Sequence, residues 1–237
     1  MDSLYIIIPT YNEEQNIKAV IDEWYPVLEQ CGDERSRLVL IDDESQDHTR
    51  EIIRQCMQNR PKLILLTKPN SGHSSTVLYG YRYAAAQQAD YIFQTDSDRQ
   101  TLPQEFPHFW QLRTQFEAII GIRSQRQDGP QRVFVQKVLL FLLWLFFGVR
   151  VPDANTPFRL MKTSLVEKYL NKLPEKSDLT NIMLTTYFAY FNEKLKFVPI
   201  TFRPRQGGTN FMNMKRITRI GLKALVDFYY LRKHIRD

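Results

Sequence analysis

The sequence predicts an α/β fold in which a mostly parallel central sheet carries helices on both faces. Short apolar runs alternate with segments of helical spacing over the first 123 residues, a pattern typical of βαβ units. In addition, 43% of the 237 residues are hydrophobic and 24% are charged, which is usual for a globular chain with a sizeable core. A chain of this length favours one compact domain.

Five apolar runs in this first part are typical of buried strands. They occupy residues 4–10, 37–42, 62–68, 90–96 and 117–123. The segments between them repeat apolar residues at helical intervals, and they occupy residues 12–32, 47–58, 74–88 and 103–116. In the first of these helices we expect Asn12 to be the N-cap and Gly32 to be the stop.

After residue 123 the pattern changes. The segment 132–151 is very apolar, and its unbroken run Val138–Phe147 is ten residues long, about half of the ~20 needed to span a bilayer. It therefore predicts either a buried helix or a helix that lies in a membrane interface. Two more strands (158–162 and 195–202), two helices (164–173 and 179–191) and a basic helix from about Asn213 complete the expected elements.

The formal net charge is +6, and nine Lys and Arg stand against two Asp from Arg203 to Asp237. Such a balance suits nucleic acid, an anionic membrane or phosphorylated substrates. Cys31 and Cys56 fall in helical patterns, so we expect reduced thiols and neither a disulfide nor a zinc site. Because nothing after Met1 resembles a signal peptide, we expect a cytoplasmic location.

Polar residues follow several of the predicted strands, where ligands bind in open α/β sheets. The strand ends read "PTYNEE", "DDESQD", "TDSD" and "GIRSQR". The first loop lacks the glycines of a dinucleotide site, and the sequence has no Walker-type phosphate loop. The chemistry at this edge of the sheet must therefore come from the acidic residues.

Asp96 and Asp98 stand two residues apart, so on extended backbone their side chains would point to the same side. Two hard carboxylates so placed suit Mg²⁺ or Mn²⁺ bridged to substrate phosphates. An aspartate turn that caps the next helix explains the pair equally well. An EF-hand is excluded because Thr101 stands where the loop needs glycine. Asp43 is either a turn residue or an acceptor for a base edge or a ribose.

Five motifs stand in the order and spacing of the family 2 glycosyltransferases: "IIIPTYNEEQNI", "LIDDESQDHT", "NSGHSSTVLYGYRYA", "QTDSDRQ" and "RQGGTN". On these motifs the chain resembles that family over about residues 4–211, and it is most similar to the branch that acts on dolichol or polyprenol phosphate. The resemblance implies the Rossmann-like GT-A fold and a metal-assisted, inverting transfer of a hexose from a UDP- or GDP-linked sugar. It also implies a nucleotide-sugar half, about residues 1–125, and an acceptor half with membrane-facing helices, about residues 126–237.

The resemblance also assigns donor-site residues. Those that would line the nucleoside pocket are Pro9, Tyr11, Glu13, Ile41 and Asp43. Those that would form the metal and sugar-diphosphate segment, with Asp96 and Asp98 as the metal ligands, are Asp96, Ser97, Asp98 and Gln100.

The remaining assignments concern phosphate and acceptor. Arg123 would face the phosphate of the acceptor or of the donor, with Arg132 beside it at the acceptor phosphate. Arg205 would reach over the diphosphate on a loop that Gly207 and Gly208 allow to close. The residues expected to take part in catalysis are Asp98, Arg123, Asp153 and Arg205. Asp153 matches a position near the acceptor, and Arg159 behind it is either functional or part of a structural ion pair. Phe211 departs from the branch, many of whose members have lysine there, so the choice of nucleotide stays open.

Transfer to a sugar hydroxyl needs a general base, and the Glu-Asp pair and the Gln-x-x-Arg-Trp motif of such family members are missing here. Asp178 is the candidate base, although its place before "LTNIML" also suits an N-cap. A polyprenyl phosphate is already an anion and needs only cations such as Arg123, Arg126 and Arg132. We therefore expect a polyprenyl phosphate acceptor, with transfer to a saccharide in surface polysaccharide synthesis as the alternative.

Other classes of function explain less of the sequence. A phosphotransferase nucleophile of the D-x-D-x-[TV] kind is not matched, since Gln100 occupies the last position. A basic module that binds RNA or membrane on an inactive transferase scaffold leaves the acidic strand ends unexplained, because carboxylates repel phosphate backbones. We expect no nucleic-acid partner, peripheral contact with the inner face of a membrane, and a membrane-protein partner or a homo-oligomer as further options.

Overall fold

The computed structural model describes residues 2–123, 130–174, 179–204, 224–229, 231–233 and 235, and the side chains of 130–134 lie outside the described part. The elements follow in the order β1 (Leu4–Thr10), α1 (Ile17–Cys31), β2 (Arg37–Asp42), α2 (Thr49–Met57), β3 (Leu63–Thr67), α3 (His73–Ala86), β4 (Tyr91–Gln94), η1 (Pro103–Glu105), α4 (Phe106–Leu112), β5 (Ala118–Arg123), α5 (Pro130–Phe147), β6 (Arg159–Lys162), α6 (Thr163–Leu170), α7 (Thr180–Tyr190) and β7 (Leu195–Ile200).

The described strands form one seven-stranded sheet in the order β3-β2-β1-β4-β6-β5-β7. Strand β6 runs antiparallel to both of its neighbours, and the other strand pairs are parallel. The predicted mostly parallel α/β sheet is therefore confirmed. The order reverses at β1, which lies between β2 and β4, so the carboxyl ends of β1 and β4 flank the topological switch point where open sheets bind ligands.

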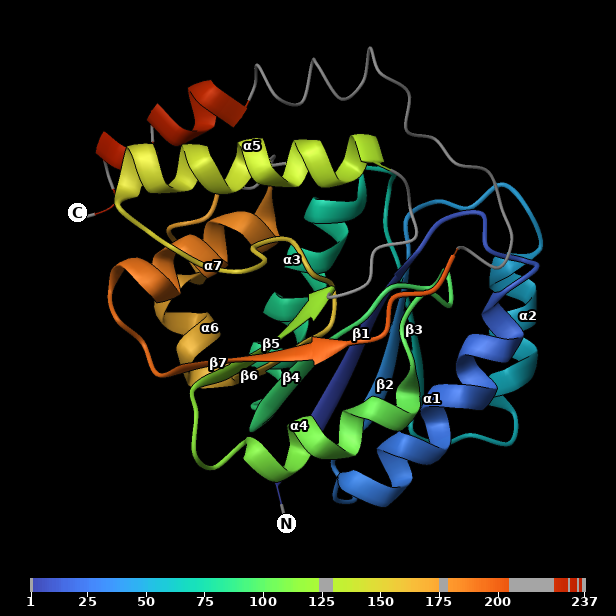
Figure 1. Cartoon of the computed structure of the whole chain (residues 1–237). Helices are drawn as coiled ribbons and strands as arrows, with labels where there is room; N and C mark the ends of the chain where they lie inside the picture. Colours follow the sequence, from blue (N-terminus) through green and yellow to red (C-terminus); the bar gives the residue numbers. More distant parts are fainter. Residues whose placement is uncertain are drawn as a thin grey trace.

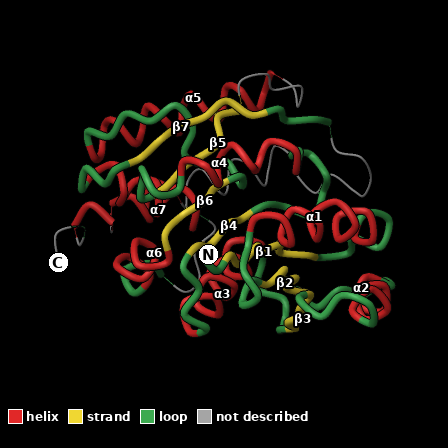
Figure 2. The backbone as a smooth tube through the Cα atoms, turned by 90° about the horizontal axis from the view of Figure 1, so that it is seen from below, coloured by secondary structure: helices red, strands yellow, loops and turns green. Residues whose placement is uncertain are grey.

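Alternate residues of the strands enter two hydrophobic cores, one on each face of the sheet. In β1, Ile7 packs under α3, α6 and α7, whereas Ile6 and Ile8 pack under α1 and α4. Figures 1 and 2 show this division, with α1 and α4 on one side of the sheet and α3 and α6 on the other. Helix α3 approaches the sheet closely at Gly80, where a Cβ atom would lie 2.4 Å from Ile7 and 2.5 Å from Ile41.

The first helix begins later than the sequence suggested. Helix α1 starts at Ile17, so the prediction that Asn12 caps it is wrong. Asn12 has a φ of 54°, and its Oδ1 atom accepts a hydrogen bond from the Gln46 backbone N–H at 2.8 Å. Asparagine tolerates the left-handed conformation better than most residues, and here it joins the loop after β1 to the loop after β2.

Helix α5 carries an apolar face that the rest of the described chain leaves uncovered. Leu143 and Phe147 are buried, but five apolar side chains on the helix are 37–56% exposed: Val135, Val138, Phe141, Trp144 and Leu145. We call these five residues the α5 face. Of the two alternatives that the sequence left open for the run Val138–Phe147, a wholly buried helix does not match these exposures, and a helix that lies in a membrane interface stays a prediction.

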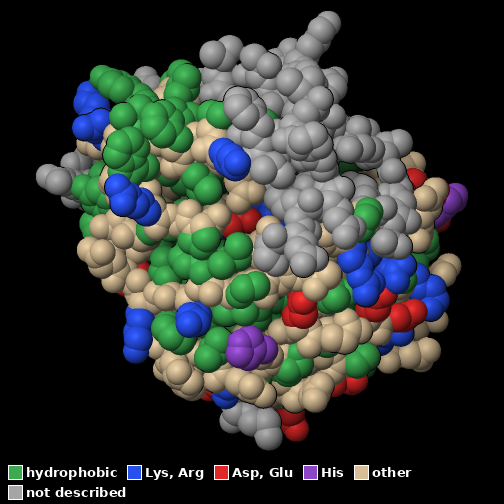
Figure 3. Space-filling model, viewed as in Figure 1, with side chains coloured by type: hydrophobic (Ala, Val, Ile, Leu, Met, Phe, Trp, Pro, Cys, Tyr) green, Lys and Arg blue, Asp and Glu red, His purple; other side chains and the backbone are tan. Residues whose placement is uncertain are grey.

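The described part of the C-terminal segment is helical and lies beside α5 (Figure 1). Phe228 is buried, with its ring 5.7 Å from that of Phe147, while Val226 and Tyr229 are 54% and 63% exposed. Figure 3 shows apolar side chains over this edge of the molecule with Lys and Arg side chains among them. Most of the basic helix predicted from about Asn213 lies outside the described residues. Among the helices that the structure describes, none is long and apolar enough to cross a membrane.

Candidate active site

The predicted donor-site residues come together at the switch point of the sheet. Tyr11 and Glu13 follow β1, Asp43 follows β2, and Asp96 and Asp98 follow β4. Strands β1, β2 and β4 are adjacent and parallel, so their carboxyl ends open at the same edge. The sheet therefore brings side chains from distant parts of the sequence into one acidic site.

The metal segment is a closed loop, so Asp96 and Asp98 do not lie on the extended backbone that the sequence analysis considered for the pair. Strand β4 ends at Gln94, and the hydroxyl oxygens of Thr95 and Thr101 close the loop at 2.7 Å. Inside it, Asp98 Oδ1 accepts a hydrogen bond from the Gln100 backbone N–H at 3.1 Å, which makes an Asx-type turn. This turn does not cap η1, whose N-cap is Leu102. Both aspartate side chains remain partly exposed.

The residue after Asp98 ties this loop to α1. Arg99 has a φ of 58° and pairs through its guanidinium with Glu23. A positive φ is unfavourable for arginine, and the ion pair with the helix helps to hold it. The ion pair thus joins the loop that carries Asp96 and Asp98 to α1.

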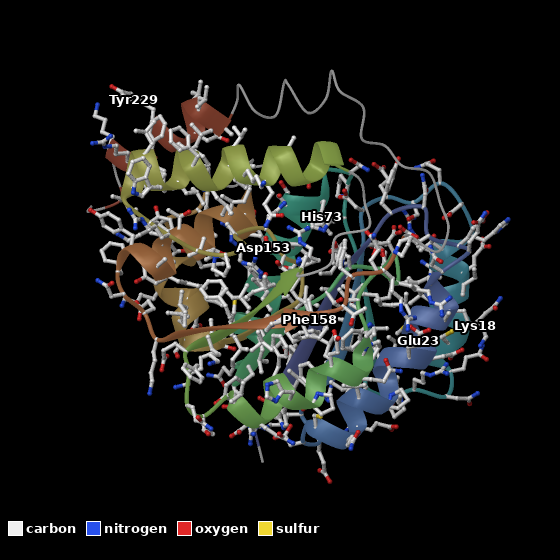
Figure 4. All side chains as sticks on the ribbon, in the orientation of Figure 1. Lys18, Glu23, His73, Asp153, Phe158 and Tyr229 are labelled. Carbon is white, nitrogen blue, oxygen red and sulfur yellow. The ribbon has the colours of Figure 1, made fainter. Side chains whose placement is uncertain are left out.

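Sequence reasoning missed His73, the first residue of α3. Its Nε2 atom lies 2.9 Å from Asp96 Oδ1 (Figure 4). Desolvation lowers the pKa of His73, but its side chain is 52% exposed, and attraction and hydrogen bonding by Asp96, with smaller contributions from Asp98 and Asp43, raise the pKa overall. The available signal was the "NSGHSS" stretch, in which a polar residue follows a glycine at a helix start.

Asp43 is held firmly at the end of β2. Its Oδ1 atom accepts hydrogen bonds from the Lys68 ammonium and, at 3.0 Å, from the Ser71 N–H. Its Oδ2 atom accepts one from the Gly72 N–H at 2.9 Å. Burial raises the pKa of Asp43, but Lys68 and these backbone donors hold it below its usual value. Asp43 is therefore an ionised acceptor fixed beside the loop that leads into α3.

The other residues expected in the nucleoside pocket differ in exposure. Tyr11 is 39% exposed, and Glu13 is buried, with Oε2 accepting a hydrogen bond from Asn16 Nδ2 at 2.8 Å. Pro9 is buried within β1. Ile41 is fully buried beneath Gly80 of α3, so it belongs to the core and the prediction that it lines the pocket is wrong.

Gln100 and Ser97 are buried in the metal segment. Gln100 Nε2 donates to the Arg203 carbonyl at 2.7 Å, and the Arg203 N–H donates to the Gln100 carbonyl at 2.8 Å. In this structure Gln100 thus anchors the chain after β7 against the metal segment. Arg205 follows two residues later and lies outside the described residues.

Arg123 and Asp153, which the sequence placed separately, form a buried bidentate ion pair. Arg123 Nε and Nη2 donate to the two Asp153 carboxylate oxygens at 2.8 and 2.9 Å. Phe202 covers the guanidinium, with its ring centre 5.3 Å from Cζ. Burial raises the pKa of Asp153, but Arg123 outweighs this and holds the pKa below its usual value. The charge expected to receive an acceptor phosphate is therefore already balanced by Asp153.

Arg159 has a structural role, but not as the ion pair that the sequence suggested. Its guanidinium is fully buried, and burial lowers its pKa. It donates to the Thr156 carbonyl at 2.8 Å, to the Ala154 carbonyl at 3.3 Å and to the Asn181 carbonyl at 3.1 Å. These bonds fasten the loop that carries Asp153 to α7.

Four further predicted residues lie outside the described part of the chain: the side chain of Arg132, Arg126, Asp178 and Phe211. The assignments of Arg132 to the acceptor phosphate and of Asp178 as a possible base remain predictions.

The donor set fits a divalent ion that is shared with a substrate. Within the described ranges, no three His, Cys, Asp or Glu side chains gather closely enough to hold a metal by themselves. Mg²⁺ usually binds through one or two carboxylates and completes its shell with water and substrate phosphates. Asp96 and Asp98 supply that number of carboxylates, on a loop beside the carboxyl end of β1.

The fold belongs to a known structural class. Glucosyl-3-phosphoglycerate synthase from Mycobacterium tuberculosis in complex with phosphoglyceric acid superposes with a TM-score of 0.72 over all of this chain and 81% of its own, at 17% identity. The same enzyme in complex with Mn²⁺ and UDP-glucose gives 0.71 over 96% of this chain and 79% of its own, also at 17% identity. The sheet order, the helical layers and this likeness define a GT-A fold.

The family follows from the sequence. Residues 5–170 match the model of glycosyl transferase family 2, so the chain belongs to that family. The predicted membership of this family is thereby confirmed, and four of the five motifs lie within the matched residues.

Curated relatives share about a quarter of their residues with this chain over the matched part. The chain is 26% identical over 193 residues to an undecaprenyl-phosphate 4-deoxy-4-formamido-L-arabinose transferase of Pseudomonas syringae, covering 80% of this chain and 56% of the relative. It is 24% identical over 228 residues to a protein of the same name from Edwardsiella ictaluri, covering 95% and 65%. The chain thus spans less than two thirds of the length of these relatives.

Proposed function

We propose that this chain transfers a hexose, with inversion, from a UDP- or GDP-linked sugar to a polyprenyl phosphate at the inner surface of a membrane, with the help of Mg²⁺ or Mn²⁺. The observation that carries the donor half of this proposal is the closed loop that holds Asp96 and Asp98 beside the ends of β1 and β2. Relatives named as undecaprenyl-phosphate sugar transferases support the acceptor class.

The donor would lie along the edge of the sheet. Asp43, ionised and fixed by Lys68, accepts hydrogen bonds from the nucleoside, and exposed Tyr11 offers a surface beside it. Asp96 and Asp98 would hold the divalent ion, which when bound stabilises negative charge on the leaving diphosphate. Because the loop is fixed by Thr95–Thr101 and its neighbours, the carboxylates need little reorganisation as that charge develops.

The transfer exchanges one bond for another. An oxygen of the acceptor phosphate forms a bond to the anomeric carbon, while the bond from that carbon to the β-phosphate oxygen breaks and its electrons leave with the nucleoside diphosphate. The acceptor is already an anion, so no general base is required. Arg205 and Arg132 are proposed as the cations for the diphosphate and the acceptor. The bidentate ion pair with Asp153 holds the Arg123 side chain in place on the acceptor side of the site.

The α5 face supports a lipid acceptor over a free saccharide. Phe141 and Leu145 are more than half exposed, and Val226 and Tyr229 of the C-terminal helix extend the apolar surface. The exposed side chains of Lys137, Arg232 and Lys233 on the same helices, and of Arg150 just after α5, add positive charge. Apolar and aromatic side chains with basic neighbours are typical of helices that lie in an anionic membrane interface. We propose that this surface rests on the leaflet that holds the acceptor.

Thermal unfolding tests the donor half of the proposal. UDP or GDP should raise the melting temperature only when Mn²⁺ or Mg²⁺ is present, because ligands that bind the native state stabilise it. Asp98→Asn should abolish this shift, whereas Asp22→Asn, a surface change on α1, should retain it. If neither nucleotide moves the melting curve of the unmodified protein with metal, the donor assignment is wrong.

A transfer assay tests the acceptor half. A panel of UDP- and GDP-sugars is offered with short-chain polyprenyl phosphate or with free saccharides. Product on the lipid phosphate is the expected result. Product on saccharides alone would overturn the acceptor assignment and favour the alternative with Asp178 as general base.

A further inference from the structure

His73 occupies a fixed position opposite the metal segment. The segment before it is anchored to Asp43 through the Ser71 and Gly72 N–H groups. Gly72 has a φ of 87°, a conformation that glycine adopts without strain. Its carbonyl then accepts hydrogen bonds from the N–H and the hydroxyl of Thr76 in the first turn of α3. These bonds fix the backbone from which the imidazole reaches Asp96.

The hydrogen bond between His73 and Asp96 has a defined direction. An ionised carboxylate only accepts hydrogen bonds, so Nε2 of His73 is the donor and Asp96 Oδ1 the acceptor, at 2.9 Å. Within the described part of the chain, His73 is the polar residue that contacts the Asp96 side chain. This hydrogen bond holds Oδ1 of Asp96, and Oδ2 is left for a cation.

We propose that His73 is a positioning residue of the divalent-cation site, which orients the Asp96 carboxylate through this hydrogen bond. The inference rests on the proposed function, since it requires a metal at Asp96 and Asp98. Ligating carboxylates commonly accept a hydrogen bond from a neighbour that sets their orientation, and loss of such a partner typically weakens metal binding by about 10- to 100-fold.

Two other roles for the same side chain predict different results. If the imidazole competed with the cation for Asp96, its removal would strengthen metal binding. If its Nε2 atom were itself a ligand, that atom would face the cation, whereas it lies 2.9 Å from Asp96 Oδ1. Metal affinity in a set of variants therefore separates positioning from competition.

The experiment measures Mn²⁺ affinity from the electron paramagnetic resonance signal of free Mn²⁺, with UDP or GDP at saturation. His73→Ala should weaken binding by about 10-fold. His73→Gln, whose side-chain N–H can still donate to Asp96, should stay within about threefold of the unmodified protein, well short of that loss. His108→Ala, at an exposed histidine on α4, is the matched control and should leave the affinity unchanged. Thermal unfolding without metal or nucleotide verifies that all three variants fold.

The outcomes are distinct. Unchanged or tighter Mn²⁺ binding by His73→Ala overturns the positioning role, and so does a His73→Gln variant as weak as His73→Ala. If the unmodified protein binds no Mn²⁺ with either nucleotide, the proposed metal-assisted function fails and the role of His73 fails with it. If the unmodified protein binds Mn²⁺ and all the variants match it, only the inference about His73 fails.

Discussion

Replacing Phe141 and Leu145 together with glutamine should weaken binding to lipid vesicles by about 30-fold. Full burial of a Phe or Leu side chain contributes roughly 1.5–3 kcal/mol. These side chains are 56% and 54% exposed, so about half of that gain, roughly 1 kcal/mol each, is still available to a membrane. Their sum of roughly 2 kcal/mol corresponds to about a 30-fold change in partitioning, since 1.4 kcal/mol is tenfold. Glutamine is a good helix former, so α5 itself should persist.

Sedimentation with vesicles of phosphatidylcholine and phosphatidylglycerol measures this change. Tyr79→Gln is the control, because Tyr79 is an exposed aromatic residue (41%) on α3, outside the α5 face. The control should sediment like the unmodified protein, and the melting temperatures of all variants should agree. Equal sedimentation of the double variant and the unmodified protein would refute the assignment of the α5 face to lipid. Failure of the unmodified protein to bind vesicles would refute it as well.

Three further predictions concern stability. Gly80→Ala should lower the free energy of unfolding by about 1–3 kcal/mol, measured in urea, because the new Cβ overlaps core side chains of β1 and β2; an unchanged midpoint would contradict this packing. Arg159→Met should lower the free energy of unfolding by about 3 kcal/mol, since it removes the hydrogen bonds of the buried guanidinium to three carbonyls, of which that of Thr156 loses two donors. Asp153 has a lowered pKa, so its contribution is present at neutral pH and is lost as the pH falls below about 4. The difference in stability between the unmodified protein and Asp153→Asn should therefore shrink on acidification, and a constant difference would exclude the ion pair as its cause.

The order of strands and helices could be predicted from the sequence, because each element buries one side and its apolar residues therefore recur at the spacing of a strand or a helix. The antiparallel direction of β6 could not, because the residue pattern of a four-residue strand does not depend on the direction in which the strand runs. The late start of α1 was missed for a local reason. Asn12 looks like a helix cap, but its side chain bonds to Gln46 in another loop, and such a contact leaves no trace in local sequence.

The acidic site was predicted by motif, but the contacts that support it were only partly predictable. Asp96 and Asp98 were identified together, although their loop geometry depends on Thr95 bonding to Thr101. Ile41 was assigned to the pocket, yet the close approach of α3 at Gly80 covers it. The loop geometry and the burial of Ile41 were missed for the same reason, since the side chain of a residue near a strand end can point either to the site or to the core. Only tertiary packing decides between the two.

The place of β6 in the sheet has a consequence for the order in which the protein folds. Among the described strands, β5 and β7 join the first four only through β6, which follows β5 in the chain but inserts next to β4. The metal segment is likewise anchored by Arg203, a residue 103 positions after Gln100. Contacts between such distant residues form late, because closing long loops costs entropy. On the ribosome, the acidic loops would thus emerge well before their anchors, and the loop that carries Asp96 and Asp98 would be anchored only after Arg203 has been made.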